Sequence, residues 1–85
     1  MAKIEIYSSL SCPFCVMAKQ LLDRKGVAYT EIRVDLDPTK RQEMMKKSRQ
    51  RTVPQIFIND ESIGGYTDLV AINNSKRLDS LLVQS

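Results

Sequence analysis

Two cysteines, Cys12 and Cys15, stand three residues apart between a segment typical of a strand and a segment typical of a helix. Pro13 between them favours the first position of a helix, where its missing N–H is not needed. Thiols at this spacing lie about one helical turn apart on the same face, close enough to form a disulfide. The pair therefore predicts a strand-to-helix junction that carries two sulfurs at the open end of the helix.

A cysteine pair of this kind has several interpretations. A C-x-x-C beside a strand–helix–strand pattern is typical of thiol–disulfide exchange. A structural staple is disfavoured, because closing so short a loop contributes only about 2 kcal/mol. A zinc site needs four ligands, and with no histidine and only two cysteines one protomer cannot complete it. Two inert buried cysteines, or a metal or cluster shared between chains, stay open, although Pro13 favours an exposed junction.

The length of 85 residues suits one small domain with one core, and we expect residues 1–85 to form it. With 42% hydrophobic and 27% charged residues, the composition is that of a soluble globular protein. The first residues contain no long apolar run, so neither a signal peptide nor a membrane span is predicted. We therefore expect a reducing compartment, the cytoplasm by default, where cysteine pairs are more often catalytic than structural.

Positive charge is concentrated in one stretch of a chain whose net charge is +3. The basic residues there, opposed only by Glu43, are Lys40, Arg41, Lys46, Lys47, Arg49 and Arg51. A solvated helix face explains this pattern, and so does a rim that attracts small anions or acidic partners. Nucleic acid is not expected as a partner, because no aromatic side chains interleave with the basic ones and no recognition motif is present.

Strand and helix patterns alternate along the first half of the chain. They predict, in order, a strand, a helix, a strand and a helix over residues 3–7, 13–25, 27–34 and 39–48. Gly26 is at the usual position after a helix, and Thr39 can cap the second helix. Met44 and Met45 lie on the buried side of that helix. Two strands joined through a helix run parallel in one sheet.

The pattern changes after Pro54. Residues 55–58 predict a third strand, Asn59-Asp60 a turn, and residues 62–63 the start of a returning strand. Gly64-Gly65 ends that strand, and Thr67 or Asp68 can cap the next helix. A break at residues 73–75 precedes a last helix with Leu78, Leu81 and Leu82. The order β-α-β-α-β-β-α, with an extra C-terminal helix, predicts an α/β fold around a mixed four-stranded sheet.

The position of Cys12 favours a reactive sulfur. If Pro13 is the first helical residue, Cys12 lies at the cap, near unpaired backbone N–H groups. The thiolate is the nucleophile, yet only about 3% of an ordinary thiol is ionised at pH 7. Lowering a pKa by ~3 units requires about 4 kcal/mol, which the helix dipole and one or two charge-assisted hydrogen bonds can supply. We predict that Cys12 is the nucleophile and Cys15, inside the first turn, the resolving thiol.

Three segments together resemble the glutaredoxin family: Cys12-Pro13-Phe14-Cys15, Thr52-Val53-Pro54 and Gly64-Gly65-Tyr66-Thr67-Asp68. The chain is most similar to short bacterial dithiol members, and the resemblance covers essentially its whole length. The resemblance implies a thioredoxin fold with strand order 2-1-3-4 and a cis peptide before Pro54. It also implies glutathione as the co-substrate, in a groove between these segments, with no permanently bound cofactor and no metal.

The expected glutathione-binding residues come from these segments and from the basic stretch: Phe14, Arg41, Arg51, Thr52, Val53, Pro54, Gly65, Thr67 and Asp68. The backbone of Val53 can pair with the cysteinyl unit as a strand would. The helix-opening N–H groups of Thr67 and Asp68 suit the γ-glutamyl carboxylate, and the Asp68 side chain can accept from its ammonium. Helix capping alone also explains Thr67 and Asp68. Arg41 and Arg51 are the candidates for the glycyl carboxylate.

The chain departs from the family pattern in three places. Relatives commonly carry a lysine shortly before the first cysteine, where this chain has Ser8-Ser9-Leu10-Ser11. The pKa of Cys12 is therefore expected to be lowered less than in those relatives. Phe14 replaces a tyrosine often found between the cysteines. Tyr66 stands where relatives usually have a small residue and is expected to alter the floor of the γ-glutamyl pocket.

The activity implied by the resemblance is glutathione-dependent reduction of protein disulfides and protein–glutathione mixed disulfides through a reversible Cys12–Cys15 disulfide. Ribonucleotide reductase is one client that it suggests, and we expect a monomer. Two alternatives stay open. Two chains and two glutathiones could hold a [2Fe–2S] cluster through Cys12, although cluster-binding relatives usually have a small residue where this chain has Pro13. Thioredoxin reductase could be the electron donor, although Thr67, Asp68 and Arg51 favour glutathione.

Overall fold

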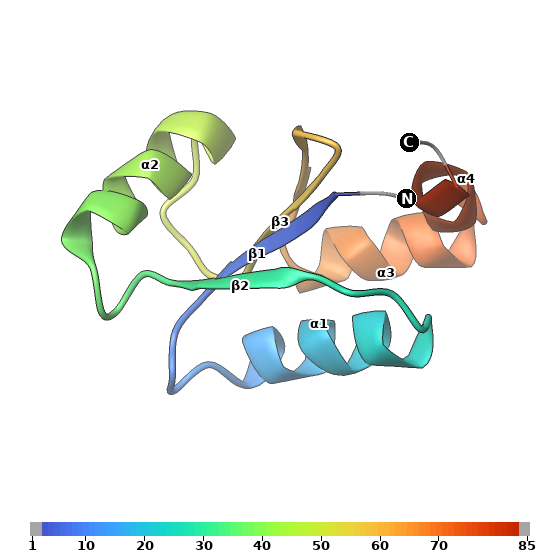
Figure 1. The fold of residues 1–85 in the computed structure, drawn as a ribbon, viewed down its shortest axis with the longest axis horizontal. Coiled ribbons are helices and arrows are strands. Elements are labelled where there is room, and N and C mark those ends of the chain that lie inside the picture. The colour runs from blue at the N-terminus through green and yellow to red at the C-terminus, as the bar shows by residue number, and fades with distance from the viewer. Residues whose placement is uncertain (1–2, 84–85) are drawn as a thin grey trace.

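Strands and helices alternate along the chain as the sequence patterns predict (Figure 1). The computed structural model describes residues 3–83. Its elements are β1 (Ile4–Ser8), α1 (Pro13–Arg24), β2 (Thr30–Arg33), α2 (Pro38–Ser48), β3 (Gln55–Ile58), β4 (Glu61–Gly64), α3 (Tyr66–Asn74) and α4 (Arg77–Val83). The sheet order is β2-β1-β3-β4, with β1 parallel to β2 and the other neighbours antiparallel. The predicted fold and the strand order 2-1-3-4 are confirmed.

The two faces of the sheet are covered by different helices, and α1 and α2 lie on opposite sides of it (Figure 1). Side chains alternate between the faces along each strand, so the core has two parts. The larger cluster joins the sheet to α1, α3 and α4 through Ile4, Ile6, Ala18, Leu21, Leu22, Ile56, Ile58, Leu69, Leu78 and Leu81. The smaller cluster, on the α2 side, consists of Tyr7, Val34, Met44 and Phe57. As predicted, Met44 is buried on α2, with Met45 packed at the edge of this cluster.

Polar contacts help the small cluster to hold α2 in place. The Tyr7 hydroxyl donates to Glu43 Oε2 at 2.7 Å, and Lys47 Nζ lies 4.8 Å from the centre of the Phe57 ring. Burial and the bond to Glu43 raise the pKa of Tyr7, and the same bond lowers the pKa of Glu43. Glu43 therefore stays ionised and bonded to the sheet at neutral pH. These contacts fix the position of α2, which carries much of the basic stretch, relative to β1 and β3.

The predicted second strand is too long. It covers residues 27–34, whereas β2 spans only Thr30–Arg33. The N–H of Val27 still bonds to the carbonyl of Leu22, so this part of the chain closes the end of α1 and does not pair in the sheet. Gly26 has φ 72, the left-handed conformation in which glycine commonly follows a helix. The start of α1 at Pro13 is confirmed, and the end of α1 and both ends of β1 differ from the prediction by one residue.

The predicted cap of α2 is wrong. Asp37, not Thr39, is the N-cap, and its carboxylate accepts from the Thr39 N–H at 2.9 Å. Pro38 takes the first helical position, which puts the cap one residue before it. An aspartate and a threonine two residues apart are both good capping residues, and Pro38 decides between them.

The predicted cap of α3 is also wrong. Gly65 is the N-cap, not Thr67 or Asp68. Asp68 sits three residues further on and accepts from the Gly65 N–H at 3.0 Å, so its carboxylate closes the first turn from inside the helix. The predicted break at residues 73–75 is displaced, since α3 continues to Asn74 and Lys76 has φ 70.

The β3–β4 connection matches its prediction. Asn59 and Asp60 both have positive φ, 53 and 67, as a two-residue hairpin turn requires. Among residues 3–83, no helix has the length and apolar character needed to span a bilayer.

Candidate active site

The cysteine pair lies at the N-terminus of α1. Cys12 is the N-cap, with an extended backbone (φ -131), and Pro13 begins the helix. Cys12 and Cys15 form a disulfide, and the backbone N–H of Cys15 donates to Cys12 Sγ at 3.1 Å. The sulfur of Cys12 therefore takes the place of the capping oxygen that a serine or aspartate would supply. This is the sequence-predicted junction, with the sulfur at the open end of the helix.

The two sulfurs differ in exposure. Cys12 keeps 9% of its surface exposed, whereas Cys15 has none. Thiol–disulfide exchange requires an approaching sulfur to reach the one that it attacks. An incoming thiolate therefore reaches Cys12 and not Cys15, which assigns the two residues different positions in any exchange reaction.

The Thr52-Val53-Pro54 segment faces the cysteines from the start of β3. Cys12 Sγ lies 3.7 Å from the carbonyl oxygen of Val53, although residues 12 and 53 are far apart in the chain. The Val53–Pro54 peptide is cis, as the family resemblance implies. The segment thus presents backbone groups of Val53 directly beside the outer sulfur.

The side chain of Gln55 makes hydrogen bonds that hold the segment before Pro54 in place. It is fully buried, and its amide nitrogen donates to the Thr52 carbonyl at 3.0 Å. The same nitrogen lies 3.3 Å from Thr52 Oγ1 and 3.3 Å from Gln50 Oε1. One buried amide therefore holds the segment from Gln50 to Thr52 in place. The sequence patterns mark residues 55–58 as a strand and do not reveal this role.

The loop before Cys12 is tied to the β2–α2 connection. The N–H of Leu10 lies 3.3 Å from Asp35 Oδ2 and donates to it. The Arg33 guanidinium beside Asp35 lowers the pKa of that carboxyl to about 2, so it is ionised at neutral pH. Because Arg33 pairs with this carboxylate, the loop lies beside an ion pair and not beside an unpaired charge.

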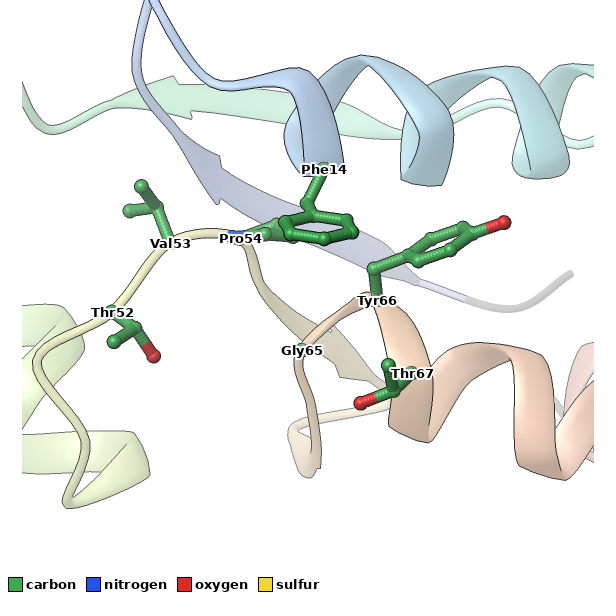
Figure 2. A pocket seen from close by; sticks show the side chains of 7 residues that line it. All are labelled: Phe14, Thr52, Val53, Pro54, Gly65, Tyr66 and Thr67. Atoms are coloured by element: carbon green, nitrogen blue, oxygen red, sulfur yellow. The ribbon is translucent and has the colours of Figure 1, made fainter.

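A cavity of about 270 Å³ opens beside the disulfide, and we call it the cysteine cavity. Its lining residues are Phe14, Thr52, Val53, Pro54, Gly65, Tyr66 and Thr67. Figure 2 shows Phe14 and Tyr66 lying next to each other, with Thr52 and Val53 on one side of the cavity and Gly65 and Thr67 on the other. The rings are stacked, with centroids 6.0 Å apart and planes at 25°.

Six of the nine predicted glutathione-binding residues line this cavity: Phe14, Thr52, Val53, Pro54, Gly65 and Thr67. Asp68 is one residue beyond the lining, bonded to the Gly65 N–H. Tyr66, expected from the sequence to alter the floor of the γ-glutamyl pocket but not predicted as a glutathione-binding residue, is a lining residue of the cavity. Its contact with Phe14 joins residues from α1 and α3, and no local sequence signal indicates it.

Arg41 and Arg51 lie in a second hollow, which we call the arginine groove. It measures about 580 Å³ and is lined by Arg41, Met45, Arg49, Gln50 and Arg51. Arg41 Nη1 lies 3.4 Å from the carbonyl oxygen of Arg51 and donates to it. The structure therefore brings the two predicted arginines together, but beside the cysteine cavity and not within it. Thr52 follows Arg51 directly, so the two hollows adjoin along the chain.

The backbone conformation and the neighbouring side chain at position 64 both require a glycine. Its φ of +113 is rarely adopted by residues with a side chain, and a Cβ there would overlap the Asp68 carboxylate. Gly65 has an ordinary extended backbone, and a Cβ there would lie 3.5 Å from the Pro54 carbonyl oxygen. The requirement for glycine therefore falls on the first of the pair, which lets Asp68 fold back onto the Gly65 N–H.

Within residues 3–83, no three His, Cys, Asp or Glu side chains gather in a way that could hold a metal ion.

Known proteins match this chain over nearly its whole length. Residues 4–63 match the family model described as glutaredoxin. Glutaredoxin 3 of Escherichia coli K12 is 49% identical over 82 residues, which cover 96% of this chain and 99% of that protein. Glutaredoxin of Pseudomonas aeruginosa is 45% identical over 82 residues, covering 96% and 98%.

Solved structures agree with the sequence matches. The solution structure of glutaredoxin from Brucella melitensis has a TM-score of 0.85 and 44% identity, and covers 96% of this chain and 89% of its own. The crystal structure of a buckwheat glutaredoxin–glutathione complex has a TM-score of 0.88 and 26% identity, covering 95% and 76%. Together with a disulfide at the open end of α1, these matches show that the chain belongs to the glutaredoxin family and is a thiol–disulfide oxidoreductase.

Proposed function

We propose that this glutaredoxin reduces protein–glutathione mixed disulfides and protein disulfides with glutathione as electron donor. The observation that carries the proposal is the unequal exposure of the two sulfurs beside the cysteine cavity, 9% for Cys12 and 0% for Cys15. Similarity to a glutaredoxin solved as a glutathione complex supports the choice of glutathione. Cys12 is the nucleophile and Cys15 the resolving thiol.

For a mixed disulfide, only Cys12 is needed. Its thiolate attacks the glutathionyl sulfur, and the client thiolate leaves. A second glutathione thiolate then attacks the same glutathionyl sulfur, which forms glutathione disulfide and restores the Cys12 thiolate. For a client disulfide, Cys12 forms a mixed disulfide with the client, and Cys15 attacks Cys12 Sγ to release the reduced client. The Cys12–Cys15 disulfide is then reduced by two glutathiones.

Glutathione is proposed to lie in the cysteine cavity with its sulfur at Cys12. The backbone of Val53, whose carbonyl lies 3.7 Å from Cys12 Sγ, pairs with the cysteinyl unit as an added strand. Phe14, Thr52, Pro54 and Gly65 form the walls. The N–H groups of Thr67 and Asp68, in the first turn of α3, bind the γ-glutamyl carboxylate, and the Asp68 carboxylate accepts from the ammonium. Arg41 or Arg51, in the adjoining groove, binds the glycyl carboxylate.

The remaining expectations are proposals of the same kind. Residues 1–85 form one domain that acts as a monomer in the cytoplasm with no permanently bound cofactor. Ribonucleotide reductase is proposed as one protein client. The similarity to Escherichia coli glutaredoxin 3 along 99% of that protein's length supports the single domain. A coloured dimeric preparation under anaerobic conditions would contradict both the monomer and the absence of a cofactor.

The electron donor is tested by comparing two regenerating systems. Turnover of a small glutathionyl mixed disulfide should proceed with glutathione and glutathione reductase, and should stay near background with thioredoxin reductase alone. The reason is that the cavity and α3 N-terminus offer partners for a small γ-linked tripeptide. Equal or faster turnover with thioredoxin reductase would reject glutathione as the donor.

Ser9→Lys should increase the fraction of Cys12 that is ionised at neutral pH. An ammonium group near a thiolate favours the charged form, and the Asp35 carboxylate that bonds this loop is already paired with Arg33. A titration of thiolate absorbance in the reduced protein measures the effect. Ser9→Gln, similar in length and uncharged, is the control. An unchanged or smaller ionised fraction in Ser9→Lys would refute the expectation.

A further inference from the structure

Three guanidinium groups line the arginine groove, from Arg41, Arg49 and Arg51. In the part of the chain from residue 3 to 83, none of them lies within 4.0 Å of a carboxylate, whereas Arg33 and Arg77 do pair with acidic side chains. Arg49 and Arg51 are exposed. The groove is therefore a concave surface of unneutralised positive charge, which attracts anionic groups.

Glutathione does not account for all three arginines. In the proposed complex its γ-glutamyl carboxylate lies at α3, and only the glycyl carboxylate is left for Arg41 or Arg51. A carboxylate is satisfied by one bidentate guanidinium. Arg49 is thus available to an anion that glutathione does not contain.

Arg49 also occupies an unfavourable backbone position. It is the first residue after α2 and has φ 60 and ψ 23, the left-handed conformation in which glycine is preferred. Its N–H bonds to the Met45 carbonyl at 2.8 Å, so the conformation belongs to the helix end and is well defined. This defined helix end fixes the point from which the Arg49 side chain reaches the groove that it lines. The position adds a positive charge to the groove where a glycine would add none.

The groove is placed to meet a client polypeptide. Arg51 adjoins Thr52, which lines the cysteine cavity. Until Cys12 attacks, the client is joined to the glutathionyl sulfur, so with glutathione in the cysteine cavity the residues that flank the client cysteine lie outside that cavity, next to its walls. Two contacts fix the groove relative to the cavity, from Arg41 to the Arg51 carbonyl and from Gln55 to Thr52.

We propose that the arginine groove binds an acidic segment of the protein client, next to its glutathionylated cysteine, with Arg49 as the specificity-determining residue. This inference rests on the proposed function and names the class of client that the site favours. The charge of the groove selects the occupant: side chains of Asp or Glu on the client fit, and those of Lys or Arg are repelled.

The test uses two glutathionylated peptides of equal length. One carries two glutamates on each side of the cysteine, and the other carries glutamines at the same positions. The measured quantity is the ratio of their kcat/KM values for deglutathionylation. We expect the unmodified protein to prefer the acidic peptide by about two- to fivefold at low salt, the range of exposed ion pairs, and to lose the preference at high salt.

Arg49→Gly is the test variant, because it removes the charge and relieves the left-handed backbone at once. It should fold at least as stably as the unmodified protein, so a loss of preference cannot be attributed to misfolding. Lys76→Gly is the matched control. Lys76 has φ 70, carries the same charge and lies between α3 and α4, at the other end of the molecule from α2 (Figure 1).

Arg49→Gly should bring the preference for the acidic peptide close to one, and Lys76→Gly should leave it unchanged. The proposal is overturned if the unmodified protein shows no preference, or if both variants reduce it equally. A different outcome concerns the proposed function: if neither peptide nor a small glutathionyl disulfide is turned over, the glutathione-dependent activity itself is wrong.

Discussion

Cys12→Ser is expected to reduce every exchange reaction to the uncatalysed rate, whereas Cys15→Ser keeps the reactions that need one thiol. The reason is the difference in exposure: Cys12 is the sulfur that solvent and substrates reach, and Cys15 is fully enclosed. Reduction of a small glutathionyl disulfide needs only Cys12. Reduction of a client disulfide needs Cys15 to release the client, and should fall to near background in Cys15→Ser.

Both reactions are measured for both variants, with glutathione and glutathione reductase as the regenerating system. A buried serine hydroxyl without a partner costs about 1–3 kcal/mol, so unfolding is measured alongside activity. Cys15→Ala, which leaves no unpaired hydroxyl, is the control for this cost. Equal losses from Cys12→Ser and Cys15→Ala in the mixed-disulfide assay would contradict the division of roles.

Gly64→Ala is expected to lower the free energy of unfolding by about 3 kcal/mol. A side chain at φ +113 is strained, and its Cβ would displace the Asp68 carboxylate. Asp68 then loses its bond to the Gly65 N–H, and the first turn of α3 loses its cap. We also expect the KM for glutathionyl substrates to rise, because Asp68 is a proposed ligand of the γ-glutamyl group. Chemical denaturation and steady-state kinetics measure the two effects.

Gly26→Ala is the control that separates backbone strain from displacement of the Asp68 side chain. Gly26 also has a positive φ, 72, but a Cβ there would have no atom within 4 Å. This variant should cost only about 1–2 kcal/mol and leave KM unchanged. Adding Asp68→Ala to Gly64→Ala should cost less than the sum of the two single changes, since the Asp68 bond is already lost. Equal costs for Gly64→Ala and Gly26→Ala, or strict additivity, would show that Asp68 is not involved.

Local chemistry explains which parts of the fold could be predicted. Pro13 places the start of α1 without ambiguity, because few positions suit a proline inside a helical pattern. The turn at Asn59-Asp60 is equally local. The cap of α2 is also set locally, because Pro38 follows Asp37. The cap of α3 is not, because Gly65, Thr67 and Asp68 stand close together and the path of the backbone brings the Asp68 carboxylate onto the Gly65 N–H.

The parts of the site that could not be predicted depend on long-range packing. The stack of Phe14 on Tyr66 joins helices that are distant in the chain. The separation of Arg41 and Arg51 from the cysteine cavity follows from the position of α2, which the Tyr7–Glu43 bond helps to set across the sheet. Patterns within one segment carry no information on such distances.

The buried amide of Gln55 has a consequence for ligand affinity. Its contacts with Gln50 and Thr52 restrict the backbone of this wall to one arrangement when the chain folds. The wall therefore loses its conformational entropy when the protein folds, and little further entropy is lost when a tripeptide binds. A preorganised wall of this kind lets a small, flexible ligand bind through a few polar contacts.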